Sequence, residues 1–259
     1  MKIVTVHFVQ VQKPFANNSE SRNYKILDLI HSDVCGPIRK ESIGGNRYFV
    51  TFIDEKSGFV EVYFLKTKNQ VKDCFLDYKA YNENQKNKKI KILRTDNGLE
   101  YWGGDFEQFL KNSGIKREFS TPYTPQQNGK AERMNRTLQE MARCMLLESG
   151  LPEFFWAEAT QTAAYIRNRC TSRSTSSDAT PYEIWYGSKP IVSHFKIFGA
   201  QAFVLNKNPN LGKFDPKSNE CIFVGYSRES KAYMLWDPSQ KKLIVSRDVE
   251  FIEKFNKRQ

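Results

Sequence analysis

The order of strand-like and helix-like patterns constrains the fold of this chain most strongly. Runs rich in β-branched and aromatic residues predict strands, and apolar residues three or four apart predict helices. As far as residue 169, the pattern predicts three strands, a helix, a strand, a helix, a strand and two helices. The strands are expected at 26–34, 48–54, 59–65, 90–93 and 115–119, and the helices at 68–84, 105–112, 129–149 and 152–169. This mixed order is typical of an α/β domain, in which helices flank a sheet.

The composition changes after this region. Residues 171–180 are rich in Ser and Thr, which indicates a boundary. Short strand-like segments then alternate with turn signals at 198–205, 221–226, 232–237, 242–245 and 249–251, a spacing typical of a small β-barrel. We therefore expect an N-terminal segment and linker (1–24), an α/β domain (25–170), a linker with a short helix (171–193) and a β domain (194–259).

Three acidic residues stand in distinctive local contexts. Asp33 lies near the end of the first predicted strand, and Asp96 follows the fourth just before an Asn-Gly turn. Glu132 falls in the first turn of the long helix, where the helix dipole favours an ionised carboxylate. Functional groups of open α/β sheets gather at strand ends, so these carboxylates could converge. Clustered carboxylates are suited to Mg²⁺ or Mn²⁺, and a pair of such ions can cut and join phosphodiesters.

The long helix has two expected faces. Ala131, Met134, Leu138, Met141 and Met145 follow helical spacing toward a core. On another side the spacing gathers Glu132, Arg136, Gln139 and Arg143. That side could combine a metal ligand with phosphate-binding arginines, or it could be an ordinary surface stripe with a Glu132–Arg136 ion pair, which contributes only about 0.3–0.5 kcal/mol.

Charge and composition narrow the classes of partner. The net charge of +11 favours a polyanion, and by itself it favours nucleic acid only modestly over an anionic membrane surface. No apolar run in the sequence approaches the roughly 20 residues that span a bilayer, so we expect no membrane partner. The five cysteines and three histidines are scattered and contain no C-x-x-C pair, so the sequence predicts no zinc site.

The segments around the three acids resemble the integrases of copia-type LTR retrotransposons. The matching stretches are Leu29 to Pro37, Leu93 to Gly98, Thr121 to Gly129 and Ala131 to Thr137. Further similarity, to the SH3-like domain that follows the core in these polyproteins, lies at Phe198 to Gly199, Cys221 to Tyr226 and Ser246 to Val249. The resemblance implies an RNase H-like core, with a mixed five-stranded sheet flanked by helices, followed by a small SH3-like β-barrel.

The resemblance also implies the roles of individual residues. Asp33, Asp96 and Glu132 would be catalytic ligands of Mg²⁺ or Mn²⁺, with two ions expected. The polar loop before the long helix would touch the DNA end and become ordered there. The complete expected DNA-binding set is Asn97, Gln126, Gln127, Asn128, Lys130, Arg133, Arg136 and Arg143.

Two departures from the family pattern stand out. The family carries a His-His-Cys-Cys zinc module before the core, and no paired cysteines precede Asp33 in this sequence. Lys130 stands where the family usually has a small apolar residue, and it would add positive charge near DNA.

The resemblance implies a polynucleotidyl transferase that processes the 3′ ends of element DNA and joins them to target DNA. Its partners would be element DNA ends, host target DNA and further copies of the chain, and a role for reverse transcriptase of the same polyprotein stays open. The expected location is the nucleus, after assembly in cytoplasmic particles. The alternative is a retroelement-derived nucleic-acid-binding protein without catalysis. The intact set of three acids favours the enzyme, and the missing zinc module favours the alternative or a fragment.

Overall fold

The structure is a computed structural model that describes residues 23–96, 98, 101, 104–119, 129–171, 178–206, 212–214 and 216–252. Its first part is a five-stranded mixed sheet with the order β3-β2-β1-β4-β5. The strands are β1 (Leu29–Cys35), β2 (Tyr48–Asp54), β3 (Val60–Leu65), β4 (Ile92–Thr95) and β5 (Lys116–Phe119). β2 pairs antiparallel with β1 and β3, whereas β1, β4 and β5 run parallel to one another.

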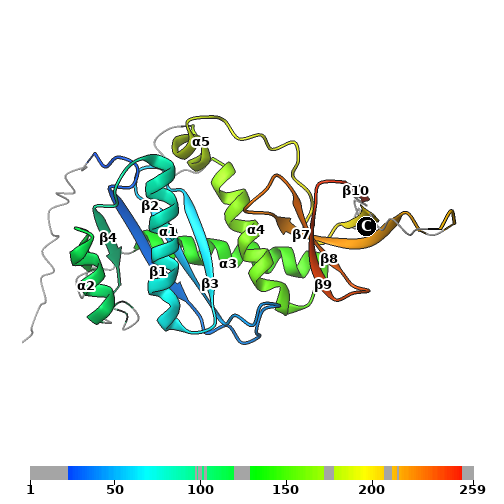
Figure 1. Ribbon diagram of the computed structural model, residues 1–259, viewed down its shortest axis with the longest axis horizontal. Coiled ribbons are helices and arrows are strands. Elements are labelled where there is room, and N and C mark those ends of the chain that lie inside the picture. The colour runs from blue at the N-terminus through cyan, green and yellow to red at the C-terminus, as the bar shows by residue number, and fades with distance from the viewer. Residues whose placement is uncertain are drawn as a thin grey trace, which may run out of the picture.

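Helices cover both faces of this sheet (Figure 1). η1 (Lys68–Gln70), α1 (Val71–Lys86) and α2 (Gly104–Asn112) precede α3 (Gly129–Ser149), η3 (Glu153–Phe155) and α4 (Trp156–Arg169). Alternating side chains of β2 enter different cores because successive strand residues point to opposite faces. Phe52 packs in the core with Phe75 of α1, and Ile53 packs in the core with Leu138 of α3. The sheet with its helices is therefore the α/β domain that the sequence pattern predicts.

The C-terminal part is a second five-stranded sheet, antiparallel throughout, with the order β10-β6-β7-β8-β9. α5 (Pro181–Tyr186) precedes its strands β6 (Gln201–Leu205), β7 (Ser218–Tyr226), β8 (Tyr233–Asp237), β9 (Lys242–Ser246) and β10 (Val249–Ile252). A separate core that includes Ala202, Phe223 and Leu235 lies within it. β7 also packs against α4, which thus contacts both sheets.

Several strands start later than the sequence pattern predicts. β1 begins at Leu29 and not at residue 26, because a turn precedes it in which Lys25 N donates to Asp28 Oδ2 and Leu27 has a φ of 69°. β4 begins at Ile92 and not at 90, since the Ile90 amide donates to the Glu83 carboxylate and not to a neighbouring strand. The limits of α3 match the prediction. Within the described residues, no helix is long and apolar enough to cross a membrane.

Candidate active site

The parallel neighbours β1 and β4 bring the two aspartates to the same end of the first sheet, at the carboxyl ends of the strands. Asp33 lies in β1, directly opposite Thr51 of β2. β1 and β4 pair in parallel, with His31 opposite Arg94. Two residues further along each strand, this register places Asp96 beside Asp33. Asp96 follows the last residue of β4, and its Oδ1 accepts a 3.1 Å hydrogen bond from the Gly98 amide.

The third acid comes from α3, which packs on the same sheet. Glu132 is exposed in the first turn of this helix, and it lines one pocket together with Asp33 and Arg136. The pocket has a volume of about 360 Å³. Arg136 and Glu132 form no ion pair with each other among the described residues, so the simple surface-pair interpretation of this helix side has no support here.

Electrostatics connect all three carboxylates. Burial, followed by the negative charges of Asp96 and Glu132, raises the pKa of Asp33 to about 6. An opposing effect comes from Asn135, whose hydrogen bond favours the ionised form. Three carboxylates that repel one another are relieved by a cation, and an all-oxygen donor set fits Mg²⁺ or Mn²⁺. By the type of their donor atoms, these three residues therefore suit a divalent metal ion.

The three side chains do not form a complete metal site. Within the part of the chain that the structure describes, no three His, Cys, Asp or Glu side chains are close enough together to hold one ion. Asp33 and Glu132 both line the pocket. Asp96 is not among the lining residues, but its negative charge raises the pKa of Asp33.

Asn135 is a site residue that the sequence analysis missed. Its Nδ2 donates to Asp33 Oδ2 at 3.0 Å, and its Oδ1 accepts a 2.8 Å hydrogen bond from Thr51 Oγ1. Asn135 is 4% exposed, and its bond to Thr51 is buried, whereas its bond to Asp33 lies at the pocket and is partly buried. It lies three residues after Glu132 and within the matching stretch Ala131 to Thr137, and this helical spacing could have placed it beside the acids. Asn135 thus fixes the orientation of the Asp33 carboxylate.

The pocket wall includes a second pair that connects β1 to α3. Gln139 was expected on the Glu132 side of the helix, and it does line the pocket. Its Nε2 donates to Cys35 Sγ at 2.6 Å. Burial, together with the charge of Asp33, raises the pKa of the Cys35 thiol to about 11, so the thiol is neutral at physiological pH.

The expected DNA-binding residues fall into three groups. Arg136 lines the pocket, and Arg133 and Arg143 are exposed on α3. Lys130 is not a free cation, because its Nζ donates to Glu55 O at 2.8 Å and to Glu55 Oε2 at 2.9 Å. The remaining expected contacts lie outside the described residues; they are Asn97, Gln126, Gln127 and Asn128.

Comparison with known families assigns both parts of the chain. Residues 24–125 match the integrase core domain, and residues 200–259 match the retroviral polymerase SH3-like domain. The matched core segment includes Asp33 and Asp96 and ends before Glu132. The fold and these matches define a protein with an integrase core followed by an SH3-like domain.

The sequence relatives are more specific. The chain is 48% identical over 235 residues to the retrovirus-related Pol polyprotein from transposon TNT 1-94 of Nicotiana tabacum, covering 91% of this chain and 18% of that protein. It is 34% identical over 242 residues to the Pol polyprotein from transposon RE2 of Arabidopsis thaliana, covering 93% and 16%. The chain thus carries an integrase core domain and a retroviral SH3-like domain, and its homologues are Pol polyproteins of plant copia-type transposons. It spans less than a fifth of the length of these relatives.

Solved structures with a related fold are more distant. One is the catalytic core of HTLV-2 integrase in complex with magnesium, which is 21% identical with a TM-score of 0.47 and covers 63% of this chain and 99% of that one. Another is the simian T-cell lymphotropic virus intasome in complex with PP2A regulatory subunit B56 gamma. It is 15% identical with a TM-score of 0.49 and covers 87% of this chain and 78% of that one. The assignment of the two domains rests on the sequence matches.

Proposed function

We propose that this chain is a metal-dependent polynucleotidyl transferase that processes the 3′ ends of element DNA and joins them to target DNA. The observation that carries the proposal is that Asp33 and Glu132 line one pocket, while the charge of Asp96 also acts on Asp33. Membership of the integrase family supports the same activity.

Asp33, Asp96 and Glu132 would hold Mg²⁺ or Mn²⁺, with two ions in the full site. Such ions supply Lewis-acid activation of the attacking oxygen and neutralise charge on the leaving oxygen of the phosphodiester. Asn135 keeps the Asp33 carboxylate turned toward the site through its 3.0 Å hydrogen bond. Arg136, on the wall of the same pocket, is placed to bind a DNA phosphate.

The proposed partners follow from the family and from charge. A net charge of +11 suits a protein that holds two DNA duplexes, the element end and the target. We include in the proposal a homo-oligomeric assembly, contact with reverse transcriptase of the same polyprotein and action in the nucleus after assembly in cytoplasmic particles.

The test is strand transfer from a labelled duplex end, with Mg²⁺ or Mn²⁺ supplied. We expect Glu132→Gln to reduce joining by at least about 10³-fold, the scale of a lost transition-state interaction of roughly 4 kcal/mol. DNA affinity should stay within about twofold, since Glu132 is not expected to contact phosphate. The matched control is Glu140→Gln, which changes an exposed glutamate two turns further along α3.

Joining by Glu132→Gln at the wild-type rate would rule out the assignment of the three acids. Suppose that the wild-type protein binds DNA with strong salt dependence but joins no DNA ends with either Mg²⁺ or Mn²⁺. That result would favour the alternative of a nucleic-acid-binding protein without catalysis.

A further inference from the structure

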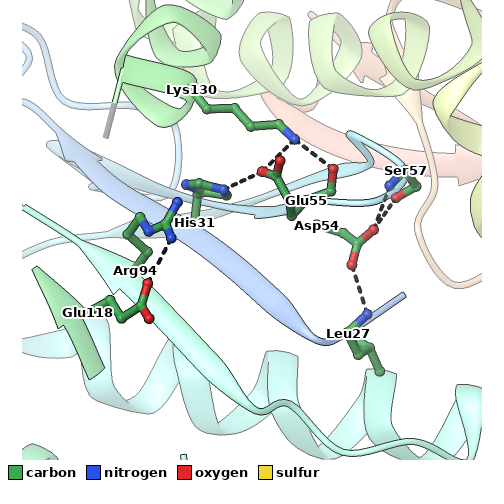
Figure 2. Close-up of polar contacts among 8 residues, drawn as sticks. All are labelled: Leu27, His31, Asp54, Glu55, Ser57, Arg94, Glu118 and Lys130. Carbon is green, nitrogen blue, oxygen red and sulfur yellow. Dashed lines mark hydrogen bonds and ion pairs between the residues drawn. The ribbon is translucent and has the colours of Figure 1, made fainter. Parts of the chain in front are cut away.

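A single carboxylate, that of Glu55, connects two of the elements that carry the proposed metal ligands. Its Oε2 accepts a hydrogen bond from His31 Nε2 at 2.6 Å and an ion-pair hydrogen bond from Lys130 Nζ at 2.9 Å. The Lys130 ammonium also donates to the backbone oxygen of Glu55 at 2.8 Å. Figure 2 shows the carboxylate between the imidazole and the ammonium.

The turn that carries Glu55 is itself firmly held. The fully buried Asp54 accepts hydrogen bonds from the Ser57 amide and hydroxyl, both at 2.7 Å, and from the Leu27 amide at 2.8 Å (Figure 2). The Glu55 amide donates to Leu29 O at 2.9 Å, which ties the turn directly to the start of β1. Glu55 is therefore anchored to the sheet by its own backbone and by its neighbour.

The charge states suit this arrangement. Although burial opposes it, the His31 hydrogen bond and the Lys130 charge lower the pKa of Glu55 to about 2, so the carboxylate is ionised. The buried His31 imidazole, which is 2% exposed, and the Lys130 ammonium both lie within hydrogen-bonding distance of the same Glu55 oxygen.

Both partners of Glu55 lie two residues before a proposed metal ligand. His31 precedes Asp33 on the same face of β1, since strand side chains alternate. Lys130 precedes Glu132 in the first turn of α3. We propose that Glu55 is a positioning residue that fixes the start of α3 to β1 through Lys130 and His31, and thereby sets Glu132 against Asp33. For its effect on metal binding, this inference rests on the proposed function.

The proposal replaces the expected role of Lys130 as a DNA contact. Lys130 is 30% exposed at its side chain and already has two acceptors on Glu55, so moving it to a phosphate would break both bonds. A DNA-contacting lysine should affect affinity and its salt dependence. A positioning lysine should instead affect the order of the helix start and the affinity for metal.

The test compares Lys130→Met, Lys130→Arg and Glu55→Gln with the wild type. The matched control is Lys79→Met, because Lys79 pairs with Glu83 at 3.0 Å on α1. The first readout is hydrogen exchange of amides 133–136, which bond to the carbonyls of residues 129–132 in α3. We expect Lys130→Met and Glu55→Gln to speed this exchange at least about fivefold, with Lys130→Arg and Lys79→Met close to wild type.

The second readout is Mn²⁺ affinity, measured by electron paramagnetic resonance without DNA. Outer-shell partners typically change metal affinity by about 10–100-fold, so we expect a loss of at least about tenfold in Lys130→Met and Glu55→Gln. DNA affinity and its salt slope should not change.

The outcomes separate the two proposals. The positioning role would be overturned if hydrogen exchange of amides 133–136 were unchanged in both Lys130→Met and Glu55→Gln. It would also be overturned if Lys130→Met lowered the salt dependence of DNA affinity without changing that exchange. The proposed metal chemistry fails if the wild-type protein does not bind Mn²⁺, or if the Glu132→Gln variant binds Mn²⁺ as tightly as the wild type does. In either case the hydrogen-exchange data still decide whether Glu55 positions α3.

Discussion

Two carboxylates, the half-buried Asp33 and the buried Glu158, have a pKa raised to about 6 for different reasons. For Asp33 the causes are burial and then two neighbouring carboxylates, an arrangement that a bound cation would relieve. For Glu158 the cause is burial in α4. Its Oε2 has no hydrogen-bond partner within the described part of the chain, and the residue is 8% exposed. A raised pKa therefore marks a candidate site only when charged neighbours contribute to it.

Glu158→Gln should stabilise the protein at neutral pH and not in acid. Below the unfolded pKa, Glu158 is protonated in both states, so wild type and variant should agree near pH 4. As the pH rises through about 6, the folded wild type must ionise a buried group, and stability is lost. A rise from 4.5 to about 6 corresponds to roughly 2 kcal/mol.

Urea unfolding at pH 4 and pH 8 measures this difference, with the exposed Glu153→Gln as the control. An equal effect of Glu158→Gln at both pH values would contradict burial of the charge as the cause.

At the scale of the element, α3 packs in the core with one face and lines the pocket with another. Ala131, Met134 and Leu138 are buried in the core that it shares with the sheet, as helical spacing predicts. On the outer face, Arg136 lines the pocket and Arg143 is exposed two turns further along. The arginines of this helix therefore extend from the pocket along its outer face, where a DNA duplex could lie.

Arg136→Ala and Arg143→Ala should each weaken DNA binding without changing the fold. Each lost phosphate contact should reduce the slope of log K against log salt concentration by about 0.9. Fluorescence anisotropy across a salt series measures the slope. Lys111→Ala is the control, because Lys111 lies on α2 and pairs with Glu107 at 3.2 Å. Slopes equal to that of the wild type would mean that these arginines do not contact phosphate.

At the scale of the whole molecule, α4 joins the two sheets. It packs against β3 of the first sheet and β7 of the second (Figure 1). Arg228, in the turn after β7, donates to Val62 O at 2.7 Å and lies 4.8 Å from the centre of the Tyr63 ring. The SH3-like sheet is thus fixed to the integrase core by packing and by a hydrogen bond to the backbone of β3.

Gly225→Ala should weaken this junction. Gly225 has a φ of 146°, and an added Cβ would lie 2.6 Å from Thr162 Oγ1 of α4. Backbone strain and the clash together should lower the free energy of unfolding by about 2–3 kcal/mol. Gly58→Ala is the control, because Gly58 has a φ of 69° and open space around its Cβ position. Thermal unfolding followed by tryptophan fluorescence compares them, and an equal loss in both variants would mean that the junction tolerates the methyl group.

The sequence by itself determined the order of the elements, the limits of α3, the local settings of Asp33, Asp96 and Glu132, and the family. These features depend on residues close together in the chain, where periodicity and short motifs carry the information. The starts of β1 and β4 were misplaced, because the turn at Lys25–Asp28 and the Glu83 bond to the Ile90 amide override strand propensity.

Only the tertiary structure decided which side chains meet. Asn135 bonds to Asp33, 102 positions away, and Lys130 bonds to Glu55, 75 positions away. A periodic pattern shows which face of an element is buried, but it does not say which residue of another element that face will touch. Strand order and register set those pairs, and they arise from the packing of the whole chain.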